Sequence, residues 1–265
     1  MSDETTVRAN APSSSRTPPA GASDNGQARD PSERETPGRE ERRLGTLLYG
    51  TFDPGSRHVR ILLAEKRIDH RPVLEKAWER RPEFLRHSPD GSLPVLIEKG
   101  HPAIGSAVAI GEYLEERFPE PAFLPASAAD RAEVRRLVQW FLVKCTHEVT
   151  RLVVSEKFLK RFLKLGEPDS RSIRAAHRNL KTHLAYIAHL VERRHYLAGR
   201  HVSLADVAAA ANLSVLDYFG DIDWSAHPLV KDWYMRMKSR RGVRSVLAER
   251  VAGLQPPRHY DRPDF

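Results

Sequence analysis

The chain has few of the residues that crosslink a protein or carry it through a membrane. Cys145 is the only cysteine in 265 residues, so no internal disulfide can form and a reducing cytoplasm is favoured. No apolar run approaches the roughly 18 residues that span a bilayer. The N-terminus has neither the basic start nor the apolar core of a secretory signal. We therefore expect a cytoplasmic protein without membrane insertion, in which Cys145 packs inertly inside a helix.

Residues 1–43 lack large apolar side chains almost entirely and are rich in Ser, Pro, Gly, Arg and Glu. Such a segment cannot bury enough surface to offset the entropy lost on ordering. The sequence therefore predicts a disordered N-terminal tail, to which we assign no role.

Positive charge is concentrated in the remainder of the chain. The formal net charge is +8, although residues 1–43 carry seven Arg against eight acidic residues. Residues 151–200 alone hold twelve Lys and Arg against four acidic residues. A folded region this basic favours acidic partners, and nucleic acid, an acidic filament and anionic lipid all remain open. The alternative is a solvated helix face without a partner.

Residues 44–124 show alternating strand and helix signals. A short apolar run, TLLYG, predicts a buried strand, and Asp53 followed by Pro54 is typical of a helix start. Further strands are predicted at HRPVLEK, LPVLIEKG and HPAIG, and a helix at SAVAIGEYLEERF. This order of elements is the thioredoxin-like arrangement, an α/β domain.

Residues 125–250 follow a proline-bearing linker and read as wholly helical. Helices are predicted over residues 130–162, 170–195 and 228–240, with one after Ser203 and a short one after Gly242. Residues 251–265 contain several prolines and predict an extended tail. The fold class is therefore α/β followed by all-α.

Two runs, LLYGTFDPGSRHVRILLAEK and GSLPVLIEKGHPAIGSAVAIGEYLEERFP, resemble the N-terminal domain of the glutathione S-transferases (GSTs). LAGRHVSLADVAAAA resembles the segment of their C-terminal domain in which Ser203 and Asp206 would form a structural capping box. The resemblance implies the GST fold and a homodimer.

Asp53 stands where the family places the Ser or Cys that activates the glutathione thiol. An ionised carboxylate cannot donate a hydrogen bond to a thiolate, and its charge would raise the thiol pKa. The N-terminus of the helix should keep Asp53 ionised. Asp53 is thus a vestigial catalytic position, and Thr51 and Ser56 are the fallback hydroxyls.

Gly105 is the second departure from the family pattern. Relatives carry Glu or Asp there, which accepts hydrogen bonds from the α-amino group of glutathione. Ser106 is retained, but a helix cap explains it. Leu93 and Pro94 match the family's cis-proline loop, whose backbone pairs with glutathione. If glutathione bound, Leu93, Pro94 and Ser106 would hold it; we expect no cofactor.

The closing segment PPRHYDRPDF carries two aromatic residues that so short a segment does not need for a core of its own. A GST frame without its chemistry and with this ending resembles the GST-like alphaproteobacterial division proteins that bind FtsZ filaments. The resemblance implies partner contacts through His259, Tyr260, Asp264 and Phe265. We expect Tyr260 to be partly docked, with Asp264 and Phe265 free. The alternative is a strap over the domain surface.

Trp78 is a further candidate partner anchor because Lys76, Arg80 and Arg81 flank it, and interfaces favour Trp and Arg. The alternative is an indole packed beneath its loop. The histidines at 177, 183, 189 and 195 do not predict a metal site, since a spacing of six turns successive residues onto different helix faces. Phe158 and Phe162 have the spacing of core contacts.

Three functions follow from these patterns. The first is a non-catalytic adaptor that binds FtsZ polymer at the division site and regulates its curvature or downstream wall synthesis. The second is a glutathione-dependent transferase or reductase with an atypical site. The third, nucleic-acid binding, depends on the basic helical surface alone.

Overall fold

The sheet is built around strand β1 (Arg43–Tyr49). The computed structural model describes residues 42–265, so the tail predicted for 1–43 lies outside the described residues except for its last two. The strand order is β2-β1-β3-β4, in which β2 (Asp69–Leu74) runs parallel to β1. Strand β3 (Val95–Ile97) is antiparallel to β1, and β4 (Ile104–Gly105) is antiparallel to β3.

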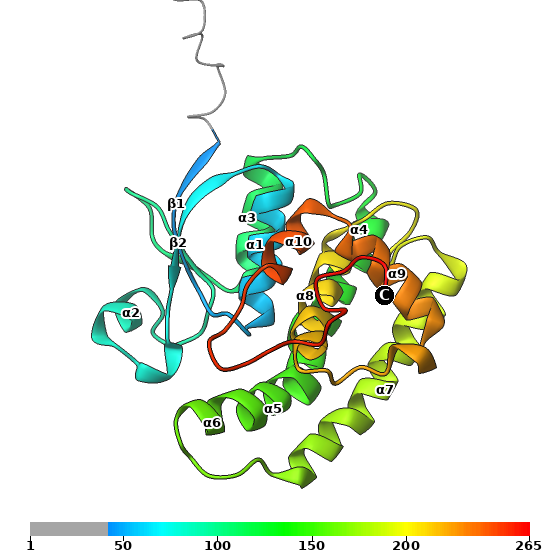
Figure 1. Cartoon of the computed structure of the whole chain (residues 1–265). Helices are drawn as coiled ribbons and strands as arrows, with labels where there is room; N and C mark the ends of the chain where they lie inside the picture. The colour runs from blue at the N-terminus through cyan, green and yellow to red at the C-terminus, as the bar shows by residue number, and fades with distance from the viewer. Residues whose placement is uncertain (1–41) are drawn as a thin grey trace, which may run out of the picture. The chain divides into compact units, whose positions relative to one another are not determined.

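Helices cover both faces of this sheet (Figure 1). Leu47 and Leu96 face the main core, which contains the apolar sides of α1 (Pro54–Glu65) and α3 (Ala107–Arg117). Leu48 packs on the other face with Phe84 of α2 (Pro82–His87). Neighbouring residues of β1 therefore point to opposite layers, as the two-residue period of a strand requires.

The helical part begins with one uninterrupted helix, made of α4 (Ala128–Gln139), η3 (Trp140–Thr150), α5 (Arg151–Val154), η4 (Ser155–Leu159) and α6 (Lys160–Phe162). It is followed by α7 (Ser170–Arg193), α8 (Leu204–Tyr218), α9 (Pro228–Lys238) and α10 (Arg241–Leu247). Every residue of α8 is buried, so the helical layer is assembled around it. The predicted capping box of Ser203 and Asp206 is present at its start. Within residues 42–265, no helix has the length and apolarity to cross a membrane.

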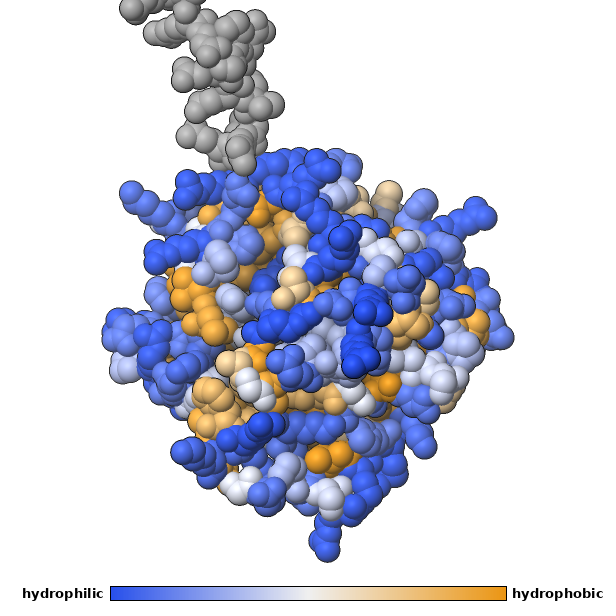
Figure 2. Space-filling model, viewed as in Figure 1, coloured by the Kyte–Doolittle hydropathy of each residue, from blue (hydrophilic) through white to orange (hydrophobic). Residues whose placement is uncertain are grey.

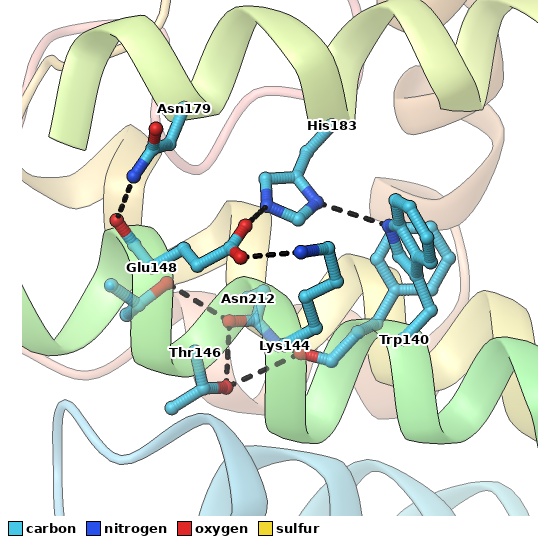
Figure 3. A network of polar contacts seen from close by, with 9 residues as sticks. Trp140, Lys144, Thr146, Glu148, Asn179, His183 and Asn212 are labelled. Carbon is cyan, nitrogen blue, oxygen red and sulfur yellow. Dashed lines mark hydrogen bonds and ion pairs between the residues drawn. The ribbon is translucent and has the colours of Figure 1, made fainter. Parts of the chain in front are cut away.

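Two stretches of the long helix, η3 and η4, are π-helical, whereas the sequence predicted a plain α-helix over 130–162. Asn212 of α8 contacts η3 at this point (Figure 3). Its side-chain amide donates to the Phe141 carbonyl at 2.9 Å, and its carbonyl accepts from Thr150 Oγ1 at 2.9 Å. A residue 71 positions away in the chain therefore donates a hydrogen bond to a carbonyl of the wider helix. No local sequence pattern predicts this contact.

His183 of α7 fastens the opposite side of η3 (Figure 3). The Trp140 indole N–H donates to His183 Nδ1 at 3.0 Å, and Nε2 lies 3.1 Å from Glu148. The proton therefore sits on Nε2. Burial lowers the pKa of His183, which favours this neutral form. Cys145 lies in the same stretch and is buried, and desolvation raises the pKa of its thiol to about 12.

The linker between the two halves is held by a buried ion pair. Lys66 Nζ lies 2.8 Å from Glu115 and donates to the carbonyls of Phe118 and Pro121 at 2.6 and 2.8 Å. Glu115 accepts in turn from the N–H groups of residues 123 and 124. Both charges are thus fully engaged, as buried ions require.

Arg57 connects three parts of the chain that are distant in sequence. Its guanidinium is completely buried on α1 and donates to the Thr51 carbonyl at 2.9 Å. The same group donates to Ser214 Oγ of α8 at 2.8 Å and to the Tyr260 hydroxyl at 3.1 Å. The sheet domain, the central helix and the C-terminal tail therefore meet at one side chain.

The C-terminal tail is docked along its length, crossing in front of α8 and ending beside α9 (Figure 1). Tyr260 is fully buried, whereas partial docking was predicted. The prediction of a free Phe265 is also wrong, because its half-buried ring stacks on His259 at 5.0 Å and meets Trp224 edge-on at 5.3 Å. Asp264 is exposed, as expected. The end of the tail therefore packs against aromatic rings from earlier in the chain, such as Trp224.

Removing the Tyr260 ring should therefore destabilise the whole fold. We expect Tyr260→Ala to lower the free energy of unfolding by about 3–5 kcal/mol, as for other buried aromatics. Tyr260→Phe should cost about 1.5–3 kcal/mol, because the buried, charged Arg57 loses one of its hydrogen-bond acceptors. Urea unfolding followed by circular dichroism measures both, with exposed Arg258→Ala as the control. Equal stability of Tyr260→Ala and wild type would show that the tail does not contribute to the core.

Candidate active site

The residues singled out in the N-terminal half converge at the end of β1. A Cβ placed on Gly55 would lie 3.2 Å from Pro94 and from Ala107, and 3.3 Å from Asp53 Oδ2. The first turn of α1, the proline loop and the start of α3 are therefore in contact around this glycine. The Leu93–Pro94 peptide bond is cis, as predicted. The segments that carry Asp53, Pro94 and Ser106 thus meet at one place, as the resemblance to the transferases implies.

Asp53 occupies the N-cap of α1, where its Oδ2 accepts from Ser56 N–H at 2.6 Å. Burial raises the pKa of Asp53 to about 6, against the lowering by Ser56 and Arg57. Asp53 was expected to stay ionised, and at neutral pH it does, although desolvation rather than the helix N-terminus has the largest effect on its pKa. Above pH 6 the group is still mostly ionised and has no proton to offer a thiolate.

The two fallback hydroxyls lie close to Asp53 but differ in access. Ser56 is fully buried, and its Oγ accepts the Gly50 N–H at 3.0 Å. Thr51 is half-buried, and its carbonyl accepts from Arg57. The Ser56 hydroxyl is therefore engaged in shaping the loop after β1, which leaves Thr51 as the more accessible of the two.

Gly105 ends β4, where it pairs with Val95. A Cβ at Gly105 would meet no heavy atom within 4 Å, so the fold leaves room for the acidic side chain that the sequence omits. Ser106 stands at the N-cap of α3 with φ of 71°, but its side chain makes no capping hydrogen bond. Ser106 therefore occupies the capping position, but the prediction that its side chain caps the helix is wrong.

Aromatic rings lie between the loop after β1 and the long helix. Phe52, buried just before Asp53, lies 5.0 Å from Phe158 and 4.8 Å from both Tyr218 and Phe219. The chain's own side chains thus occupy the region that separates the loop after β1 from the helical half.

Trp78 continues this aromatic row toward the surface. Its indole is half-buried and lies edge-on to Phe158 at 6.1 Å and Phe162 at 5.8 Å. The structure thus packs Trp78 against the long helix, while leaving part of the ring accessible. Phe162, which was predicted to be a core contact, keeps 53% of its surface exposed. The reason is its position at the last turn of α6, beyond the neighbouring helices.

Within residues 42–265, no three His, Cys, Asp or Glu side chains are grouped as a metal site would need. Of the four spaced histidines, His177 contacts Asp221 at 2.6 Å and His183 contacts Glu148. These two rings serve ion-pair and hydrogen-bond networks.

This fold and the arrangement of residues around Asp53 define the class of protein. Residues 48–122 match the family model of the glutathione S-transferase N-terminal domain, and residues 155–250 that of the C-terminal domain. The chain belongs to the glutathione S-transferase family, which confirms the predicted fold class. Among its relatives, FtsZ-localized protein A of Caulobacter vibrioides is 46% identical over 223 residues, which cover 83% of this chain and 98% of that protein.

Solved structures agree with this assignment. A glutathione S-transferase from Rhodospirillum rubrum F11 is 48% identical, with a TM-score of 0.80 over 83% of this chain and 99% of that chain. FzlA from C. crescentus is 46% identical, with a TM-score of 0.79 over the same shares. The chain is therefore similar both to a protein described as a transferase and to one described by its association with FtsZ.

The raised pKa of Asp53 gives a pH-dependent prediction. Because the folded state holds this proton more tightly than the unfolded state, the contribution of Asp53 to stability falls as pH rises from about 4 to 6. Asn also caps helices well but does not titrate. Relative to wild type, we therefore expect Asp53→Asn to be more stable at about pH 7.5 than at about pH 5, measured by urea unfolding.

Asp169, the N-cap of α7, provides the matched control. Hydrogen bonds from Ser172 lower its pKa, so its ionised form stabilises the fold throughout this pH range. The difference between Asp169→Asn and wild type should stay constant between the two pH values. A constant difference for Asp53→Asn as well would contradict the raised pKa.

Proposed function

We propose that this chain is a cytoplasmic GST-fold adaptor of cell division that associates with FtsZ and has no transferase activity. In this proposal it binds FtsZ filaments at the division site and regulates their curvature or downstream wall synthesis. The observation that carries it is the 46% identity to FtsZ-localized protein A over 98% of that protein.

The residues at the family's glutathione positions support an adaptor rather than an enzyme. Asp53 replaces the thiol-activating hydroxyl, Gly105 offers no carboxylate, and the Ser56 hydroxyl already accepts the Gly50 N–H. Phe52 and its aromatic neighbours occupy the adjoining space. We further propose a homodimer without a bound cofactor, since paired sites on a repeating filament gain effective concentration.

Co-pelleting with GTP-assembled FtsZ tests the association directly. We expect the chain to appear in the pellet only when FtsZ is polymerised, and calorimetry on the same preparation to show no heat with glutathione. An unrelated basic protein of similar charge is the control for electrostatic trapping. Enrichment no greater than that of the control would overturn the proposal.

A double variant separates the adaptor from the alternative of a glutathione-dependent transferase or reductase. Asp53→Ser together with Gly105→Glu returns the two family groups, and the open space at Gly105 accommodates the new side chain. If the site has lost its chemistry, we expect the double variant to bind glutathione at least about tenfold more tightly, which corresponds to the 1.4 kcal/mol of one charge-assisted hydrogen bond. An enzyme that uses Thr51 would bind equally well before and after the change.

A further inference from the structure

A pocket of about 940 Å³ opens between the C-terminal part of the long helix, the α6–α7 loop and the first residues of the tail. Its lining includes none of Asp53, Pro94, Gly105 and Ser106, and it has two chemically different walls. One wall is apolar and comprises Tyr218, Phe219, Leu254, Pro256 and Pro257; the other is basic and comprises Lys157, Lys160, Arg161 and Lys164.

Two of the four cations of the basic wall are not neutralised. Lys157 lies 2.6 Å from Asp221, and Lys160 lies 2.6 Å from Glu156. Within residues 42–265, Arg161 and Lys164 have no ion-pair or hydrogen-bond partner for their side chains, and Glu167 is the one acid in the lining. The basic wall can therefore accept further carboxylates.

Apolar side chains alternate with these cations along the rim. Phe162, Leu163 and Leu165 are 53%, 36% and 65% exposed, and Phe162 continues the aromatic row that reaches Trp78. Figure 2 shows apolar surface in the same region of the molecule, at the lower left where α2 and α6 lie in Figure 1. Large apolar side chains gathered at an exposed surface are typical of contact sites.

The apolar wall is held in place from below. The Tyr218 hydroxyl donates to the Leu254 carbonyl at 3.0 Å and accepts the Val251 N–H at 3.1 Å. Buried Tyr260 anchors the chain a few residues further on. The pocket therefore exists before a partner arrives, which reduces the ordering cost of binding.

We infer that this pocket binds an acidic protein segment that carries an apolar side chain. Its carboxylates pair with Arg161 and Lys164, and its apolar group packs on the wall formed by Phe219 and the tail prolines. A flat bilayer cannot follow the concave surface to Tyr218, which is 2% exposed. That the segment comes from FtsZ rests on the proposed function. That the segment is acidic and carries an apolar side chain follows from the pocket lining alone.

Charge reversal on one wall provides the test. The probe is a short fluorescein-labelled synthetic peptide of Asp and Glu with one Phe and one Leu, and its anisotropy reports binding. We expect Arg161→Glu with Lys164→Glu to weaken binding at least about tenfold. The matched control, Arg171→Glu with Arg174→Glu, makes the same charge change on exposed residues outside the pocket lining, and should change binding by about twofold or less.

The outcomes separate this inference from the proposed function. Failure of the wild type to bind the peptide, or equal weakening in both variants, overturns the inference whether or not FtsZ pellets the protein. Peptide binding with the expected variant pattern, but no pelleting with FtsZ, supports the pocket and overturns the FtsZ proposal. Preferential binding to phosphatidylglycerol vesicles or single-stranded DNA that is lost in the pocket variant also overturns the inference. Thermal melting by circular dichroism verifies that each variant is folded.

Discussion

The buried guanidinium of Arg57 is the constraint on which the arrangement of the two halves depends. Among residues 42–265 it has no carboxylate partner, and it is stabilised instead by the Thr51 carbonyl, two hydroxyls and the Phe52 ring 5.6 Å away. Asp53 acts on this charge only through space. A buried charge without a directly bonded carboxylate is costly, so each of these dipoles matters. The tail supplies one of them, and its docking is therefore coupled to the position of α1 on α8.

Local patterns were sufficient to predict most elements of this fold. Two helix starts could be predicted because residues close in sequence satisfy the free backbone N–H groups there. They are Asp53–Pro54 at α1 and Ser203 with Asp206 at α8. Buried polar groups with distant partners gave no such signal. Lys66 meets the linker about 50 residues later, and Asn212 reshapes the long helix. Their partners could be identified only once the chain was folded.

The candidate site divides in the same way. The replacements at Asp53 and Gly105 are visible in the sequence because a family frame fixes what should stand there. The pKa of Asp53 depends on burial, and the open space beside Gly105 depends on the fold. The cation-rich stretch 151–200 was read as one basic surface, but within the pocket lining ion pairs neutralise Lys157 and Lys160 and leave Arg161 and Lys164 without an acidic partner.

The single thiol of Cys145 can be used to measure local opening of the long helix. It is buried within η3, and its raised pKa suppresses the reactive thiolate. A thiol reagent can therefore reach it only when this stretch opens, and the labelling rate measures how often that happens. The chain has no second cysteine to compete for the reagent. Labelling of Cys145 therefore reports local opening of the π-helical stretch η3, where α7 and α8 pack against it.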